Sequence, residues 1–560
     1  MDGWTEASDW EAQTGESRCS PPDSIGVALS TRRVIWEGGA DAMISVTPFG
    51  PHAVRLRHSE AVTESSLERG LALDAYLESK SIPGCIERIP GFTTLLLRFD
   101  PSVPVPLEKI RDVVSDRTAV LTTSTQSTRV VPIPTTYGGP DLQRVADHAR
   151  LRPEEVVERH CAGTYRVHCL GFAPGFPYLG GLDPALLTPR LATPRTRVPA
   201  GSVAIGGEHA GIYSVASPGG WNLIGRTSAP LFNPVGDSLE ALFLLRPGDQ
   251  VRFVAESNAD SVQRGGEELP DPGAGLEPML RIVETGMGLT LQDLGRPGFA
   301  RFGVPPSGCM DPELAAVANR LVENPASAPV LEMALQGQRF EVLRDGWLAV
   351  GGDGVDGQGS RGSAFRVRAG ETLSFPPAPS GVWRYLAVPG GWVGRTLMGS
   401  RSGGIRLGEA FSLKRGDVLN VAAGARAGIP AAVARRTWAP PAGVTVAAEA
   451  FPIWPGPQWD EFTAEGRERF FQTAWVLSSQ CDRVGYRLQG DGIAGVPMPG
   501  ISEPVLPGSI QVPPDGRPIV TMPDGPTLGG YPKIGWMDPA TRARLSQCRA
   551  GQGIRFVPAS

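Results

Sequence analysis

The sequence is short of lysine, of histidine and of long apolar runs, and each shortage narrows the possible functions. Only four of its 53 basic residues are lysines, and all six histidines lie at or before His209. The second half of the chain therefore cannot build a histidine-based metal site or catalytic triad alone. No apolar run approaches the roughly 20 residues of a membrane-spanning helix, and the acidic N-terminus lacks a signal-peptide core. We therefore expect a cytoplasmic protein with no membrane partner and no metal site.

Several recognisable motifs are also missing. The seven cysteines include no Cys-x-x-Cys pair, which favours reduced thiols over a disulfide framework or a zinc site. A net charge of −5 provides no basic surface, so nucleic acid is not the expected partner. The chain has no G-x-x-x-x-G-K-[ST] loop and no strand-linked G-x-G-x-x-G, so any nucleotide site must be of another kind. It also lacks a Met-Lys-Met sequence, so a biotin would have to arrive on another chain.

Glycine and proline are abundant, with 71 and 54 residues, as many short strands and tight turns require. At 560 residues the chain is too long for one core, and its 41% hydrophobic and 20% charged residues are typical of a soluble globular protein. We predict a mainly β protein with a small α+β unit. The predicted parts are a disordered extension (1–24), an α+β domain (25–135), a β domain (136–255), an acidic Gly/Pro-rich linker (256–278) and a region of two β-barrel-like modules (279–560).

A few segments have helical spacing. Leucines spaced three and four apart predict a helix over Glu64–Lys80, and shorter helices are expected over Pro106–Val114 and Asp311–Leu321. Two more are expected within Asp141–Ala162, with Asp141 capping the first of them.

The stretch Pro507–Gly535 reads as two short strands, each followed by a Pro-Asp-Gly turn, and it ends in Gly-Gly-Tyr-Pro-Lys-Ile. A similar pattern occupies Ala200–Arg226. A second pair of similar segments begins at Leu170 and at Leu294. Two matches in the same order predict duplicated β modules. If the second module carries an insertion, its two motifs should be brought together in one cleft.

Four residues in these motifs are candidates for catalysis: Asp293, Arg296, Tyr531 and Lys533. A carboxylate and a guanidinium on one turn can orient an amide N–H and hold an anion, although a local ion pair would serve the turn equally. The phenol and the ammonium could stabilise developing negative charge. The structural alternative is a packed tyrosine and a lysine extending to solvent.

Two glycine-containing turns are candidates for binding. An aromatic turn could line a small-molecule pocket, and a Gly-Gly turn surrounded by polar groups could approach a phosphate or a planar amide. Core packing and a purely structural turn remain open for both. The candidates are Phe172, Gly175, Phe176, Ser217, Gly219, Gly220, Asn222 and Arg226.

Long motifs in both halves resemble a known family. They are L-G-F-A-P-G-F-P-Y-L-G-G, S-P-G-G-W-N-L-I-G-R-T, L-Q-D-L-G-R-P-G, G-S-R-S, I-Q-V-P-P-D-G-R-P-I-V and G-G-Y-P-K-I. The first half resembles the B-type component of 5-oxoprolinase and the second half the C-type component, also known as allophanate hydrolase subunits 1 and 2. The resemblance adds Gln511 to the binding candidates. It implies cyclophilin-like β-barrels after an α+β domain, and two normally separate subunits fused across the 256–278 linker.

The resemblance implies an ATP-dependent reaction, with Mg²⁺, that hydrolyses 5-oxoproline to L-glutamate together with a separate A-type component. Two alternatives stay open. One is a carboxyltransferase of the urea amidolyase type, which acts on a urea-like substrate with biotin carried by another chain. The other is a regulatory binding protein that inhibits a sensor kinase. The sequence departs from the family pattern after Asp524, which begins D-G-P-T-L-G-G-Y, and at His168, where a larger aromatic or apolar residue is expected.

Overall fold

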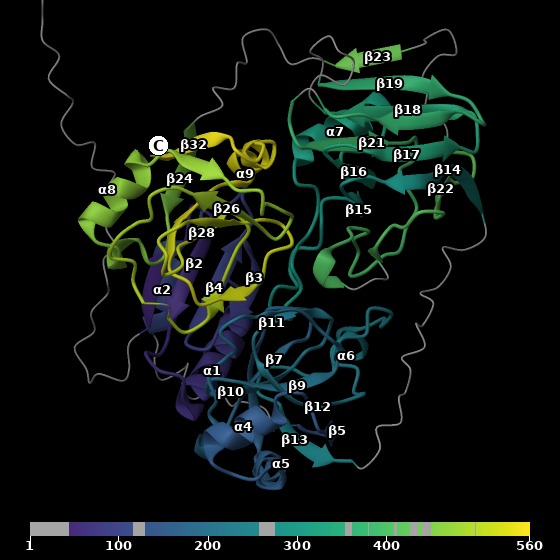
Figure 1. Ribbon diagram of the computed structural model, residues 1–560. Helices are drawn as coiled ribbons and strands as arrows, with labels where there is room; N and C mark the ends of the chain where they lie inside the picture. The colour runs from purple at the N-terminus through teal and green to yellow at the C-terminus, as the bar shows by residue number, and fades with distance from the viewer. Residues whose placement is uncertain are drawn as a thin grey trace, which may run out of the picture.

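The computed structural model describes residues 44–115, 129–256, 275–352, 361–378, 380–407, 411–425, 435–438, 450–498 and 500–559 (Figure 1). The predicted extension at 1–24 and most of the predicted linker, residues 257–274, lie outside these residues. The described chain forms four units in sequence order: an α+β unit, a first barrel, a central pair of sheets and a C-terminal barrel. The prediction of a mainly β protein with a small α+β unit and barrel modules is confirmed.

The α+β unit places two helices against a four-stranded sheet of order β1-β2-β4-β3. Its elements are β1 (Ser45–Pro48), β2 (Ala53–Arg57), α1 (Glu64–Lys80), β3 (Cys85–Pro90), β4 (Thr94–Phe99) and α2 (Leu107–Ser115). Helix α1 has the predicted bounds and begins at a capping box between Thr63 and Ser66. Leu73 and Leu77, four residues apart, face the sheet and are buried.

The first barrel is closed, with strand order β10-β7-β6-β13-β5-β12-β9. Its elements are β5 (Val130–Tyr137), α4 (Leu142–Ala149), α5 (Pro153–Ala162), β6 (Tyr165–Leu170), β7 (Pro177–Gly180), η1 (Pro184–Leu186), β8 (Arg195–Val198), β9 (Ser202–Gly206), β10 (His209–Ile212), β11 (Ser217–Gly219), β12 (Asn222–Arg226), α6 (Leu239–Leu242) and β13 (Gln250–Ala255). Strands β8 and β11 pair separately.

Two details of this barrel differ from the predictions. The predicted domain boundary at 135/136 falls inside β5, because Val131 and Ile133 alternate into the barrel core while β5 pairs in parallel with β13. Asp141 occupies the N-cap position of α4, but its side chain makes no capping bond. Its carboxylate instead accepts hydrogen bonds from Arg195 and from the backbone N–H of Leu223, both at 2.7 Å.

The central unit consists of two sheets, a four-stranded one of order β20-β17-β14-β22 and a six-stranded one of order β15-β16-β21-β18-β19-β23. Its elements are β14 (Leu276–Thr285), β15 (Leu289–Gln292), α7 (Pro312–Leu321), β16 (Val330–Ala334), β17 (Gln338–Val342), β18 (Gly346–Gly351), β19 (Gly362–Val367), β20 (Thr372–Phe375), β21 (Trp383–Ala387), η2 (Ile405–Leu407), β22 (Val418–Ala422) and β23 (Arg435–Trp438).

Within the described residues the central sheets form no closed barrel, which differs from the prediction of two barrel-like modules in 279–560. One apolar core lies between the two sheets, with Ile282 and Phe340 from one and Leu331 and Leu386 from the other. Helix α7 packs on β18, β19 and β21. Both faces of the six-stranded sheet are thus covered without closure.

The C-terminal barrel is closed, with strand order β24-β31-β28-β29-β26-β25-β32. Its elements are β24 (Ala450–Pro455), η4 (Trp459–Glu461), α8 (Ala464–Gln472), β25 (Trp475–Leu477), β26 (Gly485–Gln489), β27 (Glu503–Pro504), β28 (Ser509–Gln511), β29 (Ile519–Thr521), β30 (Leu528–Gly529), β31 (Lys533–Trp536), α9 (Pro539–Ser546) and β32 (Gly553–Pro558).

The two barrels have the same strand order around the ring, so the predicted duplication is confirmed. In each barrel the first and last strands pair in parallel, and a separate two-stranded pair precedes the Gly-Gly turn. The matched glycines Gly201 and Gly508 both have positive φ, and a Cβ on either would lie within 2.4 Å of a carbonyl oxygen. Glycine is therefore required at the same point of both barrels.

The second predicted pair of repeats is not a repeat of barrel elements. The segment from Leu294 lies between β15 and α7 of the central unit, whereas the C-terminal barrel uses residues 478–484 between the strands that correspond to β6 and β7. The two segments instead lie side by side: the Gly175 N–H donates to the Phe302 carbonyl at 2.8 Å. Gly303 passes so close to Ala173 that a Cβ would lie 2.3 Å from its carbonyl oxygen. Their similarity reflects shared Gly-Pro turn chemistry.

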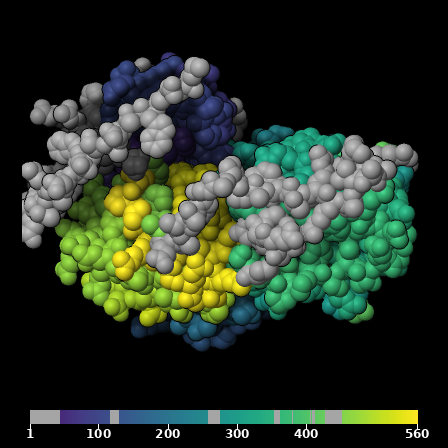
Figure 2. All heavy atoms as spheres, turned by 90° about the horizontal axis from the view of Figure 1, so that it is seen from above, coloured from purple at the N-terminus to yellow at the C-terminus, as the bar shows by residue number. Residues whose placement is uncertain are grey.

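The units pack tightly against one another. Seen from above, the yellow-green C-terminal barrel lies against both the purple α+β unit and the teal-green central sheets (Figure 2). One core cluster joins α7 of the central unit to the C-terminal barrel, and another joins Phe49 and Leu96 of the α+β unit to Leu506 and Trp536. In the described part of the chain, no helix is both long enough and apolar enough to cross a membrane.

Four histidines provide a test of the fold. Burial lowers the pKa of His160 to about 3 and those of His58, His168 and His209 to about 4. At pH values between these lowered pKa values and about 6.5, the four histidines bind protons in the unfolded chain but not in the native chain. The stabilisation is therefore complete above about pH 6.5 and is lost as the pH falls.

We expect the free energy of unfolding, measured in urea, to decrease between pH 7.5 and pH 5.5 by about 1.4 kcal/mol for each such histidine. The variant His168→Leu should show a smaller decrease, since it removes one of the four groups. The exposed His148 provides the control His148→Leu. An equal decrease in all three proteins would contradict the interpretation.

Candidate functional site

A cavity of about 840 Å³ lies between the two barrels, and three of the four units line it. The first barrel contributes Phe172, Tyr178 and Ser217, and the central unit contributes Arg406. The C-terminal barrel contributes its β25–β26 loop and the turn after β30. The volume is in the range of small-molecule sites.

The side of the cavity next to the first barrel is aromatic. Phe172 has a φ of 65°, which is uncommon for a residue with a side chain. Arg406 holds it there: its Nη1 donates to the Phe172 carbonyl at 2.5 Å, and its guanidinium lies 5.1 Å from the centre of the Phe172 ring. Phe176 packs edge-on against Phe172 and Tyr178 behind the surface.

The charged groups of this cavity are mainly cationic. Of the described residues that line it, Arg190, Arg406 and Arg487 are basic and Asp482 is acidic. Burial lowers the pKa of Arg406, and its Nε has no hydrogen-bond partner among the described residues. An anionic ligand would offset this excess of positive charge. The cavity can therefore hold a molecule with an apolar part and a carboxylate or phosphate.

Four of the predicted site residues line this cavity: Phe172, Ser217, Gln511 and Tyr531. The Ser217 hydroxyl is buried and has no partner among the described residues, so it can serve a ligand. The Gln511 side-chain amide donates to Thr521 at 3.0 Å. Tyr531 is 41% exposed at the rim.

Two of the other binding candidates, Asn222 and Gly219, have structural roles. Asn222 is fully buried, and its amide donates to the carbonyls of Pro189 and Ile205. A Cβ on Gly219 would lie 2.1 Å from the Tyr213 hydroxyl, so this glycine allows close packing. The remaining candidates outside the cavity lining are Gly175, Phe176, Gly220 and Arg226.

Asp293 and Arg296 hold the G-S-R-S loop. Asp293 accepts hydrogen bonds from the Ser400 hydroxyl at 2.5 Å, the Ser402 hydroxyl at 2.6 Å and the Arg401 N–H at 2.6 Å. The buried Arg296 donates to the carbonyls of Leu397 and Ser402. No ion pair joins Asp293 to Arg296 in the described chain. These residues therefore position the segment that leads to Arg406.

Lys533 belongs to a different network. It is 1% exposed, and its Nζ donates to Glu503 at 2.9 Å and to the Tyr531 carbonyl at 3.3 Å. Glu503 also pairs with Arg55 at 3.2 Å. Burial opposes ionisation of Glu503, but the charges of Lys533 and Arg55 outweigh it and lower its pKa to about 2.

The four predicted catalytic residues therefore lie in two separate hydrogen-bond networks. The small cavity beside Lys533 and Tyr531 is lined by neither Asp293 nor Arg296. This arrangement differs from the predicted single cleft. The cause is the arrangement of the chain: Asp293 and Arg296 belong to the central sheets, and Lys533 to the barrel. The structural alternative, a lysine that extends to solvent, is also wrong, because Lys533 is buried.

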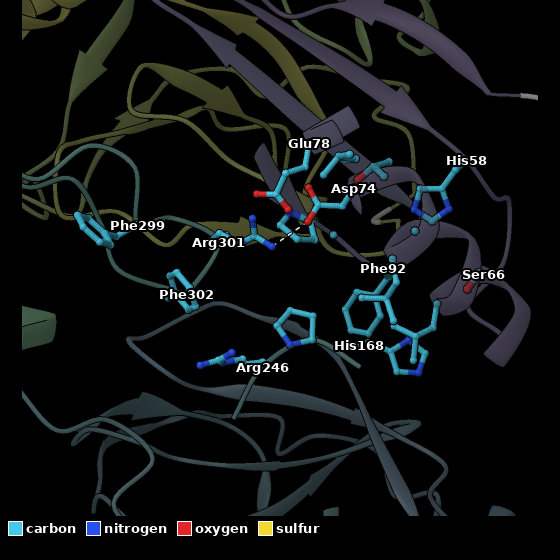
Figure 3. A pocket seen from close by; sticks show the side chains of 18 of the residues that line it. His58, Ser66, Asp74, Glu78, Phe92, His168, Arg246, Phe299, Arg301 and Phe302 are labelled. Carbon is cyan, nitrogen blue, oxygen red and sulfur yellow. Dashed lines mark hydrogen bonds and ion pairs between the residues drawn. The ribbon is translucent and has the colours of Figure 1, made fainter. Parts of the chain in front are cut away.

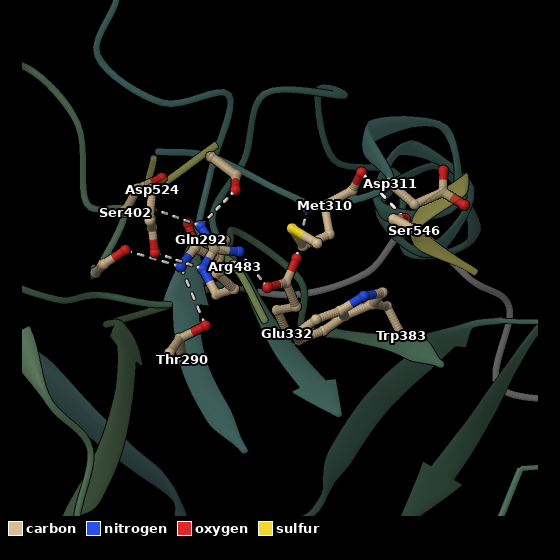
Figure 4. A network of polar contacts seen from close by, with 12 residues as sticks. Thr290, Gln292, Met310, Asp311, Glu332, Trp383, Ser402, Arg483, Asp524 and Ser546 are labelled. Carbon is tan, nitrogen blue, oxygen red and sulfur yellow. Dashed lines mark hydrogen bonds and ion pairs between the residues drawn. The ribbon is translucent and has the colours of Figure 1, made fainter. Parts of the chain in front are cut away.

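A buried ion cluster fixes the loop that carries Asp482 into the large cavity (Figure 4). Arg483 pairs with Asp524 of its own barrel at 2.8 Å and with Glu332 on β16 of the central unit. It also donates to the Gly308 carbonyl at 2.9 Å. Burial opposes the charge of Arg483, but the two carboxylates outweigh this and raise its pKa.

A second cavity, of about 420 Å³, lies where α1, the first barrel and the loop 298–302 meet (Figure 3). Arg301 of that loop pairs with Asp74 of α1 at 2.8 Å. His58 and His168 line this cavity, but none of the predicted site residues does. In the described ranges, no three His, Cys, Asp or Glu side chains are grouped so that they could hold a metal ion.

Sequence reasoning missed the arginines of the large cavity. Arg406 follows the G-S-R-S motif by four residues, so that motif was a usable signal. Arg190 and Arg487 lie in segments with no distinctive pattern, and only the packing of two barrels brings them together.

Comparison with known proteins covers nearly the whole described chain. A model of carboxyltransferase domain subdomains C and D matches residues 44–243, and one of subdomains A and B matches residues 302–558. The C-type component of 5-oxoprolinase from Escherichia coli is 36% identical over 50% of this chain and 92% of that protein. The B-type component from Bacillus subtilis is 40% identical over 38% of this chain and 94% of that protein.

These matches decide the family. The chain belongs to the carboxyltransferase-domain family of the B-type and C-type components of 5-oxoprolinase. It carries the B-like half first and the C-like half second, so the predicted fusion is confirmed. A crystal structure of the protein TTHA0988 has the same arrangement, with a TM-score of 0.74 and 35% identity over 90% of this chain and 99% of that one. Urea amidolyase of Lachancea kluyveri is also related, at 29% identity over 56% of this chain and 18% of that protein.

The Arg483 cluster gives a prediction about stability. Arg483→Met leaves two buried carboxylates without their cation, so the free energy of unfolding should decrease by about 3–5 kcal/mol. The control is Arg487→Met, an exposed arginine in the same barrel, which should change it by at most about 0.5 kcal/mol. Urea unfolding of both variants measures this. Similar values for the two would show that the cluster contributes little.

Proposed function

We propose that the chain is the fused B-type and C-type component of an ATP-dependent 5-oxoprolinase. The reaction converts 5-oxoproline, ATP and water into L-glutamate, ADP and phosphate, and it requires a separate A-type component. The observation that carries the proposal is that one chain holds a B-like and a C-like half, with a cationic cavity lined by both. ATP, used with Mg²⁺, would supply the phosphoryl group that activates the lactam carbonyl.

The cavity between the barrels suits such a substrate. The ring methylenes of 5-oxoproline would pack on Phe172 and Tyr178, and the arginines would hold its carboxylate or a phosphate. Gln511 and Ser217, whose hydroxyl has no partner among the described residues, line the cavity and would orient the lactam amide.

The relation to urea amidolyase supports a second candidate function, carboxyl transfer to a urea-like amide. That reaction needs biotin on another chain. The two candidates differ in product: glutamate and phosphate for the first, a carboxylated amide for the second.

The test is glutamate release from 5-oxoproline and ATP by the full chain with an A-type component. We expect turnover with both proteins present and little or none with either alone. The variant Arg406→Gln should lower kcat/KM by about 10- to 100-fold, because it removes a charged hydrogen-bond donor from the cavity.

The control is Arg401→Gln, from the same loop. The Arg401 side chain donates to the Gly394 carbonyl and does not line the cavity. Its kcat/KM should stay close to that of the wild type. Full activity of Arg406→Gln, or glutamate release by the chain without a partner, would contradict the proposal.

A further inference from the structure

Three buried charges from both halves of the chain meet beside the large cavity. Arg55 lies on β2 of the α+β unit, Glu503 on β27 and Lys533 on β31 of the C-terminal barrel. They are 7%, 8% and 1% exposed, respectively. Glu503 forms an ion pair with each of the two cations, with Arg55 at 3.2 Å and with Lys533 at 2.9 Å. The cluster therefore has one buried positive charge more than it has negative charges.

The Glu503 carboxylate has several hydrogen-bond partners, whereas the two cations keep donors without a partner among the described residues. Glu503 also accepts from the Gln458 side-chain amide at 2.6 Å. The Arg55 Nε has no partner among the described residues. The Lys533 ammonium has three donors, and its hydrogen bonds in the described chain use two of them. Unused donors on a buried, uncompensated cation are costly unless something accepts from them.

The excess positive charge does not come from the barrel itself, as a comparison of the two barrels shows. Gly219 pairs with Arg195 in the first barrel, as Gly529 pairs with Glu503 in the other. Asp141 accepts from the Leu223 N–H, as Gln458 accepts from the Lys533 N–H. The first barrel thus has Arg195, Asp141 and Leu223 where the second has Glu503, Gln458 and Lys533. Both sets are neutral overall, so the extra positive charge of the cluster comes from Arg55 of the α+β unit.

The excess charge borders a cavity. A space of about 70 Å³ is lined by Arg55, Arg57, Lys533 and Tyr531, with the carboxylates of Glu461 and Glu503. This volume accommodates a group several times the size of a water molecule. Gly500, Gly530 and Tyr531 line both this space and the large cavity, so the two adjoin.

We propose that the space beside Arg55 and Lys533 is an anion subsite, which binds a carboxylate or phosphate group of a ligand held in the large cavity. Arg55 comes from the B-like half, and Glu503 and Lys533 come from the C-like half. The subsite is therefore complete only when the two halves are in contact. The presence of the anion subsite does not depend on the reaction proposed above, but the identity of its ligand does.

The test is isothermal titration of the full chain with inorganic phosphate, with 5-oxoproline and with 2-pyrrolidinone, the same lactam without a carboxylate. The decisive variant is Glu503→Gln, which removes the competing negative charge. An anion subsite should then bind its anion about tenfold more tightly than in the wild type. A cluster with only a structural role would lose stability and gain no affinity.

Lys533→Met and Arg55→Met should lower anion affinity at least about tenfold, for the opposite reason. The matched control is Arg88→Met, which breaks the pair with Asp74 in the α+β unit outside this space and should leave anion affinity unchanged. Circular dichroism checks folding. If Lys533→Met does not fold, Glu503→Gln still decides.

The probes distinguish the two sources of the anion. Binding of 5-oxoproline but not of 2-pyrrolidinone, altered in the variants, identifies a carboxylate subsite, and binding of phosphate alone identifies a phosphoryl subsite. Failure of folded Glu503→Gln to bind either anion more tightly than the wild type overturns the proposal. Turnover without anion binding here would refute the subsite alone, and anion binding without turnover would refute only the proposed reaction.

Discussion

Buried ion pairs between residues of different units are the constraint on which the rest of the structure depends. Arg483 has one carboxylate partner in its own barrel and another, Glu332, on a strand of the central sheets. If the units separated, each group would have to be solvated again or left unpaired, and an unpaired buried charge is strongly destabilising. The walls of the large cavity therefore have a fixed relative position, although three units contribute to them. Fixed walls favour catalysis, because donors that are already oriented need no reorganisation during the reaction.

The sequence predicts features whose cause is local. Helix α1 follows from leucines spaced on one face, and the duplication follows from glycines such as Gly201 and Gly508 that one backbone geometry demands. The contact between Arg55 and Glu503 has no such signal, because the two residues are 448 positions apart. The resemblance between the segments at Leu170 and Leu294 was misleading for a related reason: similar turn residues occur in unrelated elements.

Part of the candidate site could be predicted from the sequence, again where a local motif marks the residues. Phe172, Ser217 and Tyr531 lie beside glycine-containing turns that marked them, Gln511 was marked by the family resemblance, and all four line the cavity. Asp293 and Arg296 were marked by an equally distinctive motif, but their side chains are used to hold the Ser400–Ser402 loop. A motif identifies residues that one geometry requires. Whether the geometry holds a ligand or another loop is decided by what packs against it.

The duplication gives the two barrels the same frame but not the same surface. Around the large cavity the first barrel presents the rings of Phe172 and Tyr178 together with Arg190, whereas the second presents Asp482 and Gln511 among both polar and apolar residues. A cavity whose two sides carry different side chains favours one orientation of a ligand whose two ends differ. A symmetric pair of barrels could not impose an orientation, because both sides would offer the same contacts. Divergence at a few surface positions, on strands that keep their order, therefore provides a way to build a directional site from a duplicated fold.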